Sequence, residues 1–188
     1  MAASNAPLPI GTKAPDFALP DVRTGATVRL GDLAAAPALL VVWTCNHCPY
    51  VKHVRPALAA FARAYAPRGL AIVGISSNDA ARYPDDAPAR LAAEADAYGL
   101  VFPILFDETQ AAARAYHAAA TPEFYLFDRE RRLVYCGRFD ASRPGSSTPL
   151  TGDELAAAVD AVLAGEVPPH PGNVAVGCGI KWKPGHQP

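Results

Sequence analysis

The stretch Val41-Val42-Trp43-Thr44-Cys45-Asn46-His47-Cys48-Pro49 places two cysteines at a C-x-x-C spacing directly after an apolar run. That run, residues 38–43, is continuous and partly β-branched and follows a proline, which is the pattern of a central strand buried on both faces. Beyond Cys48 the apolar residues recur every three or four positions, which predicts a helix as far as Tyr65 that Pro56 should kink. The cysteine pair is therefore expected between the end of a buried strand and the start of a helix.

Strands and helices alternate along the rest of the chain. The expected strands are 26–30 in an N-terminal β-hairpin, 70–75, 102–106, and a second hairpin of 124–127 with 133–136. The expected helices are 88–98, 107 to about 116 with a capping box at Asp107 and Gln110, and a last helix with a capping box at Thr151 and Glu154 that Gly165 ends. This order predicts right-handed crossovers and one sheet covered by helices on both faces, an α/β fold.

Length and composition restrict the class of protein. The chain has 188 residues, enough for one domain with a modest extension, and 51% of them are hydrophobic, which excludes a largely disordered protein. We expect a flexible N-terminus over 1–9, a domain over 10–165 and a Pro/Gly-rich tail without regular structure over 166–188. A formal net charge of −1 argues against a nucleic-acid partner. Neither a membrane span nor an export signal is found, so we expect no membrane partner and a cytoplasmic location.

The position of the cysteine pair suggests redox chemistry. A helix N-terminus carries unpaired amides and roughly half a positive charge, which stabilise a thiolate. Cys45, which we expect to be the more exposed, is predicted to be the attacking thiolate, and Cys48 the resolving thiol. His47 should add a switchable positive charge beside both sulfurs. These three are the predicted catalytic residues of a thiol–disulfide oxidoreductase that needs no cofactor.

A metal-binding protein and an inert buried pair are alternatives for the same motif. A copper or zinc carrier would use both cysteines of the motif with His47 or His53. A closed zinc site normally draws four ligands from two close-spaced pairs, whereas Cys136 and Cys178 are isolated in the sequence. We expect Cys136 to be a buried small hydrophobe, and Cys178 is a candidate third redox thiol if the tail folds back.

Several motifs resemble the thioredoxin-like redoxin superfamily, which includes the alkyl hydroperoxide reductase and thiol-specific antioxidant (AhpC/TSA) proteins. They are residues 14–20 (Ala-Pro-Asp-Phe-Ala-Leu-Pro), the cysteine motif, Gly74-Ile75-Ser76 and Thr121-Pro122, and the resemblance spans roughly 10–165. Residues 45–53, 140–144 and 177–184 resemble a peroxiredoxin-like subgroup of it. The resemblance implies a thioredoxin-like fold with a central mixed sheet, protein or small-molecule disulfides as substrates, and an upstream thiol reductant.

The resemblance also implies a substrate-binding surface. It places Pro122, in a cis peptide after Thr121, opposite the cysteine pair, so that the Thr121 backbone would bind an extended substrate chain. Trp43, one position earlier than the tryptophan of thioredoxins, is a further substrate-binding candidate. The strand before the motif lacks the buried acid of thioredoxins, so proton transfer falls to His47, to Glu123 or to water.

A thiol-dependent peroxidase is the alternative enzyme, with peroxides as substrates and an antioxidant role. Peroxiredoxins share the pattern P-x-x-x-T-x-x-C. If Cys48 is aligned with its cysteine, Cys45 stands at the threonine position and Val41 at the proline position. The usual peroxide pocket is therefore not encoded, although Arg143 or Arg138 could supply its guanidinium if neither forms a surface ion pair.

Overall fold

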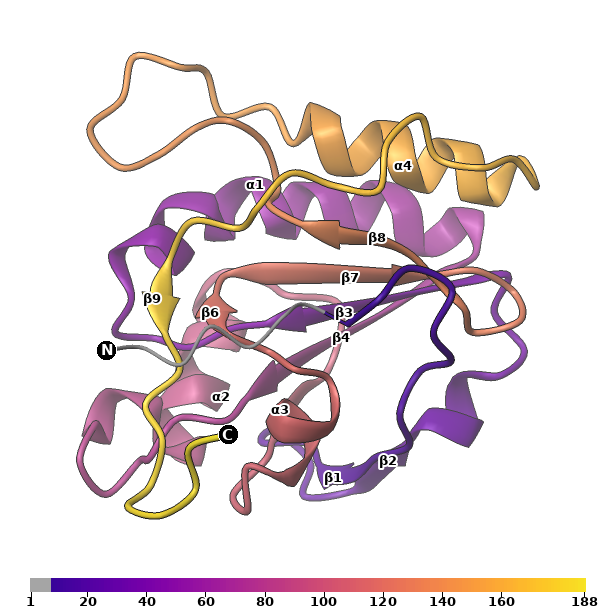
Figure 1. The fold of residues 1–188 in the computed structure, drawn as a ribbon. Helices are drawn as coiled ribbons and strands as arrows, with labels where there is room; N and C mark the ends of the chain where they lie inside the picture. The colour runs from indigo at the N-terminus through magenta and orange to yellow at the C-terminus, as the bar shows by residue number, and fades with distance from the viewer. Residues whose placement is uncertain (1–7) are drawn as a thin grey trace.

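The structure, a computed structural model, describes residues 8–188, so most of the N-terminus predicted to be flexible lies outside the described residues. Its centre is a five-stranded sheet in the order β5-β4-β3-β7-β8 (Figure 1). These strands are β3 (Ala38–Trp43), β4 (Leu70–Ser76), β5 (Ile104–Phe106), β7 (Glu123–Phe127) and β8 (Leu133–Gly137). Strands β3, β4 and β5 run parallel, whereas β7 and β8 are antiparallel to their neighbours. The predicted mixed sheet and the second hairpin are confirmed.

Strand β3 lies in the middle of the sheet and is buried along its whole length. Leu40 and Val42 contribute to one hydrophobic cluster, and Leu39, Val41 and Trp43 to a second cluster on the opposite face. Burial on both faces explains why its sequence is continuously apolar instead of alternating. The strand ends at Trp43, beside Ile75 of β4 and Glu123 of β7. The cysteine motif therefore leaves the sheet at a fixed position.

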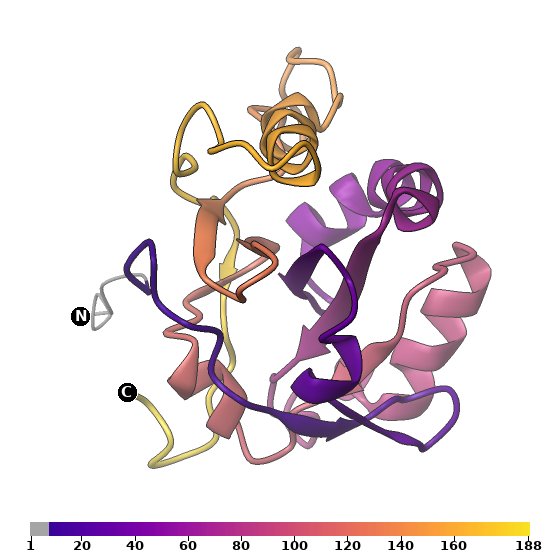
Figure 2. The same ribbon diagram turned by 90° about the vertical axis from the view of Figure 1, so that its right-hand side faces the viewer.

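Helices cover both faces of the sheet, as predicted. Helices α1 (Pro49–Tyr65), α2 (Pro88–Ala97) and α4 (Asp153–Leu163) pack on the face of Leu40 and Val42, whereas the short α3 (Ala111–Ala115) packs on the other face (Figures 1 and 2). The N-terminal hairpin of β1 (Ala18–Pro20) and β2 (Thr27–Arg29) also lies on the side of α3. Within residues 8–188, no helix has both the length and the apolar character needed to cross a membrane.

Both predicted capping boxes are wrong. Helix α3 begins after Gln110, which has a φ of 59° and whose amide donates to the carbonyls of Ser77 and Lys181 instead of to its own helix. Helix α4 begins after Gly152, and Glu154 pairs with Arg138. In each case a distant partner takes the Gln or Glu of the box, which sequence spacing cannot reveal, although Asp107 Oδ2 still accepts from the amide of Ala113 in α3 at 2.9 Å.

The tail contains a short strand where we expected no regular structure. Cys178–Gly179 form β9, which pairs antiparallel with β6 (Ala120–Thr121), and Cys178 lies opposite Thr121 (Figure 1). Ile180 is buried in the cluster on the α3 face. We call residues 174–183 the C-terminal strap. A strand of two residues carries no periodicity, so the sequence could not predict it.

Candidate active site

The two cysteines of the motif lie in the loop that joins β3 to α1. Cys48 is the N-cap residue of α1, and Pro49 occupies the first turn, as predicted. Both side chains are fully buried, with exposed fractions of 0%. All four cysteines of the chain are free thiols. The expectation that Cys45 is the exposed cysteine is therefore wrong.

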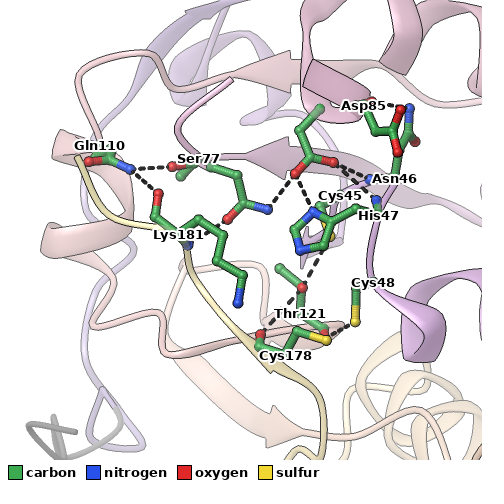
Figure 3. Close-up of polar contacts among 12 residues, drawn as sticks. Cys45, Asn46, His47, Cys48, Ser77, Asp85, Gln110, Thr121, Cys178 and Lys181 are labelled. Atoms are coloured by element: carbon green, nitrogen blue, oxygen red, sulfur yellow. Dashed lines mark hydrogen bonds and ion pairs between the residues drawn. The ribbon is translucent and has the colours of Figure 1, made fainter. Parts of the chain in front are cut away.

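Hydrogen-bond donors converge on the sulfur of Cys48. The thiol of Cys178 points to it (Figure 3), the thiol of Cys45 also hydrogen-bonds to it, and the main-chain amides of Val51 and Cys178 act in the same direction. The hydrogen bond from Cys45 is the largest cause of a pKa for Cys48 well below the ordinary thiol value, and it outweighs the opposing effect of burial. When protonated, Cys48 donates instead to the carbonyl of Thr121 at 3.2 Å. These contacts lower the pKa of Cys48 and so favour the negative charge of the reduced site on its sulfur.

Cys45 is the proton-holding partner of this pair. Its pKa is raised, first by the hydrogen bond to Cys48, then by burial, and further by the negative charge of Asp86. The Cys45 sulfur lies 3.3 Å from the hydroxyl of Thr121, and that hydroxyl lies 3.4 Å from the carbonyl of Cys178. This direction is opposite to the prediction that Cys45 ionises near neutral pH, because the contacts that lower a thiol pKa, including that of the Val51 amide in the first turn of α1, are made to Cys48.

His47 is fixed by Asp86, a buried carboxylate that the sequence did not indicate. Asp86 has an exposed fraction of 0%, and its Oδ2 lies 2.5 Å from Nδ1 of His47. Because a carboxylate can only accept, Nδ1 carries the hydrogen. Nε2 is buried and, among the described residues, has no hydrogen-bond partner. The ring also stacks on Tyr83, with centroids 5.1 Å apart.

Four donors hold the carboxylate of Asp86. Its Oδ1 accepts from the main-chain amides of Asn46 at 2.7 Å and His47 at 3.2 Å, and its Oδ2 accepts from the Asn78 side chain at 2.8 Å as well as from the His47 ring. Asn78 Oδ1 in turn accepts from the amide of Lys181 in the strap. Asp86 thus supplies the buried acid that we missed in the strand before the motif. It lies 38 residues after Cys48, and no local pattern marks it.

Arg55 of α1 fixes the loop from the helix side. Its guanidinium donates to the carbonyl of Cys45 at 2.8 Å and to Oδ1 of Asn46 at 3.0 Å, and it pairs with Glu94 of α2. The side chain is buried, with an exposed fraction of 4% for the residue. Arg55 follows Val51 by four positions and precedes Leu58 by three, which places it on the apolar face of the predicted helix, a signal that sequence inspection could have used because a buried charge needs partners.

Of the predicted substrate-binding residues, Thr121 and Pro122 lie beside the cysteine pair, whereas Trp43 lies in the core. The Thr121–Pro122 peptide is cis, as the resemblance implies. The Thr121 backbone, however, is paired with Cys178 of the strap, so the chain itself occupies the edge expected to bind substrate. Trp43 has an exposed fraction of 0% and packs against Tyr116 in the core, with centroids 5.6 Å apart, so it forms no part of a binding surface.

Glu123 and Cys136 line a cavity to which no residue of the cysteine motif contributes. Glu123 Oε2 accepts from the amide of Ala119 at 3.1 Å, and burial raises its pKa. Cys136 is half-buried, and burial raises its pKa to about 12. Both line a cavity of about 490 Å³ together with Leu8, Ile10 and Val174. Neither the hydrogen bond to Ala119 nor the position of Glu123 in this cavity supports the proton transfer that we considered for it.

The remaining candidates lie beside α1. His53, considered above as a metal ligand, is 2.8 Å from the hydroxyl of Ser142, and it lines a shallow pocket with Arg143 and Pro122. Arg138 forms an ion pair with Glu154, as one of our two expectations for it stated. A peroxide pocket at Cys48 therefore receives no guanidinium from Arg138.

One cluster among the described residues has the composition of a metal site. The Cys45 sulfur, a ring nitrogen of His47 and a carboxylate oxygen of Asp86 lie within 4.8 Å of one another. Thiolate, imidazole and carboxylate are the ligand types of zinc. Cys48 and His53, which the carrier hypothesis also used, are not part of this cluster.

Comparison with known proteins gives these residues a context. A model of the AhpC/TSA family matches residues 10–136. A hypothetical protein from Sinorhizobium meliloti 1021 is 49% identical with a TM-score of 0.92, over 95% of this chain and 97% of that one. An uncharacterized conserved protein from Geobacillus kaustophilus is 47% identical with a TM-score of 0.91, over 94% and 93%.

The thiol-disulfide oxidoreductase ResA of Geobacillus kaustophilus (strain HTA426) is 27% identical over 128 residues. The match spans 64% of this chain and 64% of the length of that curated relative. The thioredoxin-like fold expected from the resemblance is confirmed by the solved structures.

Proposed function

The chain belongs to the AhpC/TSA family, and we propose that it is a thiol–disulfide oxidoreductase in which Cys48 is the attacking thiolate and Cys45 the resolving thiol. The observation that supports this proposal is the convergence of hydrogen-bond donors on the Cys48 sulfur, which lowers the pKa of that thiol. The roles are the reverse of those predicted from the sequence. Substrates are protein or small-molecule disulfides, and an upstream thiol reductant returns the pair to its reduced state.

In the first step, a substrate displaces the strap from Thr121 and so exposes Cys48, which is fully buried while the strap is in place, and the Cys48 thiolate attacks one sulfur of the substrate disulfide. The bond between the two substrate sulfurs breaks, a Cys48–substrate mixed disulfide forms, and the other half of the substrate leaves as a thiolate. Cys48 then carries no negative charge. The hydrogen bond from Cys45 to that charge, which is the largest cause of the raised Cys45 pKa, is lost at the same time. Formation of the mixed disulfide therefore prepares Cys45 to ionise.

In the second step, Cys45 attacks the Cys48 sulfur. His47 Nε2, the ring nitrogen left without a partner among the described residues, accepts the Cys45 proton, and Asp86 stabilises the imidazolium through Nδ1. The Cys45–Cys48 disulfide forms, and the second half of the substrate leaves as a thiolate. The protein dithiol loses two electrons and the substrate disulfide gains them. His47 acts as the base, and Asp86 is its positioning residue.

Trapping of a mixed disulfide tests this assignment. A Cys45→Ser, Cys178→Ser variant should form a stable mixed disulfide with oxidised glutathione through Cys48, because no resolving thiol remains. Cys48→Ser should lose exchange, whereas Cys136→Ser should retain the wild-type rate and serves as the control. Rapid exchange by Cys48→Ser through Cys45 would overturn the proposal.

Peroxide reduction by Cys48 is the second candidate, because the ionised cysteine is the one that aligns with the peroxiredoxin pattern. It has less support, since Arg138 is held by Glu154. Stopped-flow oxidation by hydrogen peroxide separates the two functions: a rate no faster than that of free cysteine excludes the peroxidase. A reducing compartment such as the cytoplasm would keep the pair ready to reduce disulfides, and we include that location in the proposal.

A further inference from the structure

The C-terminal strap covers the cysteine pair and presents a third thiol to it. Cys178 pairs with Thr121, the residue predicted to bind an extended substrate, so the strap occupies the position of a substrate strand. The Cys178 thiol points to the Cys48 sulfur (Figure 3), and the Cys178 amide also hydrogen-bonds to that sulfur. The strap thus places a cysteine where a substrate would place its own sulfur.

Several contacts hold the strap in this position. The carbonyl of Lys181 accepts from the amide of Asp79 at 2.8 Å and from the Gln110 side chain at 3.0 Å. On the other side of Cys178, the carbonyl of Asn173 accepts from the amide of Arg138 at 3.0 Å. Between these anchors, Val174 is 84% exposed. The strap is therefore fixed at both ends around Cys178, while the segment before it faces solvent.

Exposure differs between the two thiols that contact Cys48. Cys45 is fully buried, whereas Cys178 is half-buried. While the strap is in place, a disulfide between Cys45 and Cys48 would offer an incoming reductant two buried sulfurs, whereas one between Cys48 and Cys178 would include a half-buried cysteine. Burial raises the pKa of Cys178 to about 11. Like Cys45, Cys178 therefore holds its proton while Cys48 is charged.

We propose that Cys178 is a third redox thiol, which forms a disulfide with Cys48 and brings the oxidised state of the buried pair within reach of the upstream reductant. This inference rests on the proposed function. The Cys178 thiolate attacks Cys48 in the Cys45–Cys48 disulfide, and the Cys48–Cys178 bond forms as the Cys45–Cys48 bond breaks. Cys45 leaves as a thiolate and takes up the proton that Cys178 gives up. This exchange needs no further oxidant or reductant. A thiolate of the reductant then attacks the sulfur of Cys178, the Cys48–Cys178 bond breaks, and Cys48 leaves as a thiolate. A second thiol of the reductant attacks the resulting mixed disulfide and releases Cys178, and the reductant is left as a disulfide.

Tryptic mapping after oxidation with diamide, which converts two thiols to a disulfide, tests the proposal. Trypsin leaves Cys45 and Cys48 together in peptide 30–52, Cys136 in 133–138 and Cys178 in 139–181. We expect wild type to yield 30–52 joined to 139–181, in addition to 30–52 with an internal disulfide. In Cys45→Ser the joined pair should be the dominant product, and in Cys178→Ser it should be lost. Cys136→Ser is the matched control and should keep it.

The glycines beside Cys178 supply a second test that keeps every thiol. A Cβ at Gly177 would lie 2.1 Å from the carbonyl oxygen of Thr121, whereas a Cβ at Gly179 would meet only the carbonyl oxygen of Ala119, at 3.8 Å. Gly177→Ala should therefore push the strap away from Thr121 and reduce the joined peptide severalfold, and Gly179→Ala should not. Unchanged joining in Gly177→Ala would contradict the geometry.

The outcomes separate this inference from the proposed function. Disulfide exchange by wild type with only the internal 30–52 disulfide, and no joined peptide in Cys45→Ser, overturns the role of Cys178 and leaves the function intact. A joined peptide without any exchange of oxidised glutathione overturns the function alone, because diamide forms the disulfide without a substrate.

Discussion

Replacing Asp86 with asparagine should stop the second chemical step while leaving the first intact. The change keeps the shape of the side chain and removes its charge. An asparagine Oδ1 can still accept from the amides of Asn46 and His47, which both donate to Oδ1 of Asp86. The amide group, however, replaces Oδ2 with a donor that faces the His47 ring and the Asn78 side chain, which both donate to Oδ2 in the native protein.

The His47 ring can answer this change, and the answer disables it as a base. If Nδ1 accepts from the new amide, the hydrogen moves to Nε2, which can then no longer take the Cys45 proton. Loss of a general base costs about 10²–10⁴-fold in rate. The same change removes a charge that raises the Cys45 pKa, which favours the reaction, but Asp86 ranks behind the Cys48 hydrogen bond and burial among its causes. Slowing therefore wins.

The stability cost can be worked out from the same contacts. The side-chain NH2 of Asn78 would face the NH2 of the new asparagine at position 86. Asn78 cannot turn its Oδ1 toward that NH2 without losing the hydrogen bond that Oδ1 accepts from the amide of Lys181. One hydrogen bond to a charged group is therefore lost, worth about 1.5–3 kcal/mol. At about 2–4 °C per kcal/mol for a chain of this size, Tm should fall by about 3–12 °C. The variant should remain folded at room temperature.

The assay uses the Cys178→Ser background, so that only Cys45 can resolve. Samples reacted with oxidised glutathione are quenched with acid, and the mass of the intact protein is measured by mass spectrometry. Asp86→Asn should accumulate the glutathione adduct on Cys48, and His47→Gln should do the same with the carboxylate in place. An adduct that is resolved as fast as in the parent would refute the assignment of His47 and Asp86.

Three further predictions concern stability and the pH dependence. The folded pKa of Cys48 is lowered and that of Cys45 is raised, so the pair should add stability as pH rises toward the ordinary thiol pKa of about 8.5 and lose it above that pH. In denaturant titrations, the unfolding free energy of wild type relative to Cys48→Ser should therefore peak near that pH. A difference that does not change with pH would contradict the charge assignment. Glu123→Gln should raise Tm at pH 7, because burial raises the pKa of the native carboxyl and its ionisation therefore costs stability. The gain in Tm should vanish below about pH 4, where Glu123 is protonated in both the folded and the unfolded protein. A gain that persists at low pH would point to packing instead. Arg55→Lys should lower the unfolding free energy by about 1–3 kcal/mol and speed alkylation of Cys45, because a lysine lacks the forked guanidinium that contacts both the Cys45 carbonyl and Asn46. If Cys45 in this variant is alkylated at the wild-type rate, then Arg55 does not hold the loop.

The fold around the cysteine pair could be predicted because it depends on local patterns. The apolar run of β3 and the change to helical spacing after Cys48 define the strand, the helix and the loop between them. The sequence also placed β4, the β7–β8 hairpin and the cis peptide before Pro122, the last only through the family resemblance.

The electrostatics of the site could not be predicted, because they depend on distant partners. The sequence puts both cysteines at a helix start, but Asp86, Thr121 and Cys178 decide which sulfur carries the charge. Each comes from a different segment. The strap is harder still, since its two-residue strand is stabilised by Asn78 and Gln110 and has no pattern of its own.

A thiol titration of the reduced protein, followed by ultraviolet absorbance of the thiolate, tests the central claim most directly. Wild type should show one thiol that ionises well below pH 8.5, and this transition should be absent from Cys48→Ser and still present, though moved to higher pH, in Cys45→Ser. If the low transition persists in Cys48→Ser and disappears in Cys45→Ser, then the charge belongs to Cys45 and our account of the site is wrong.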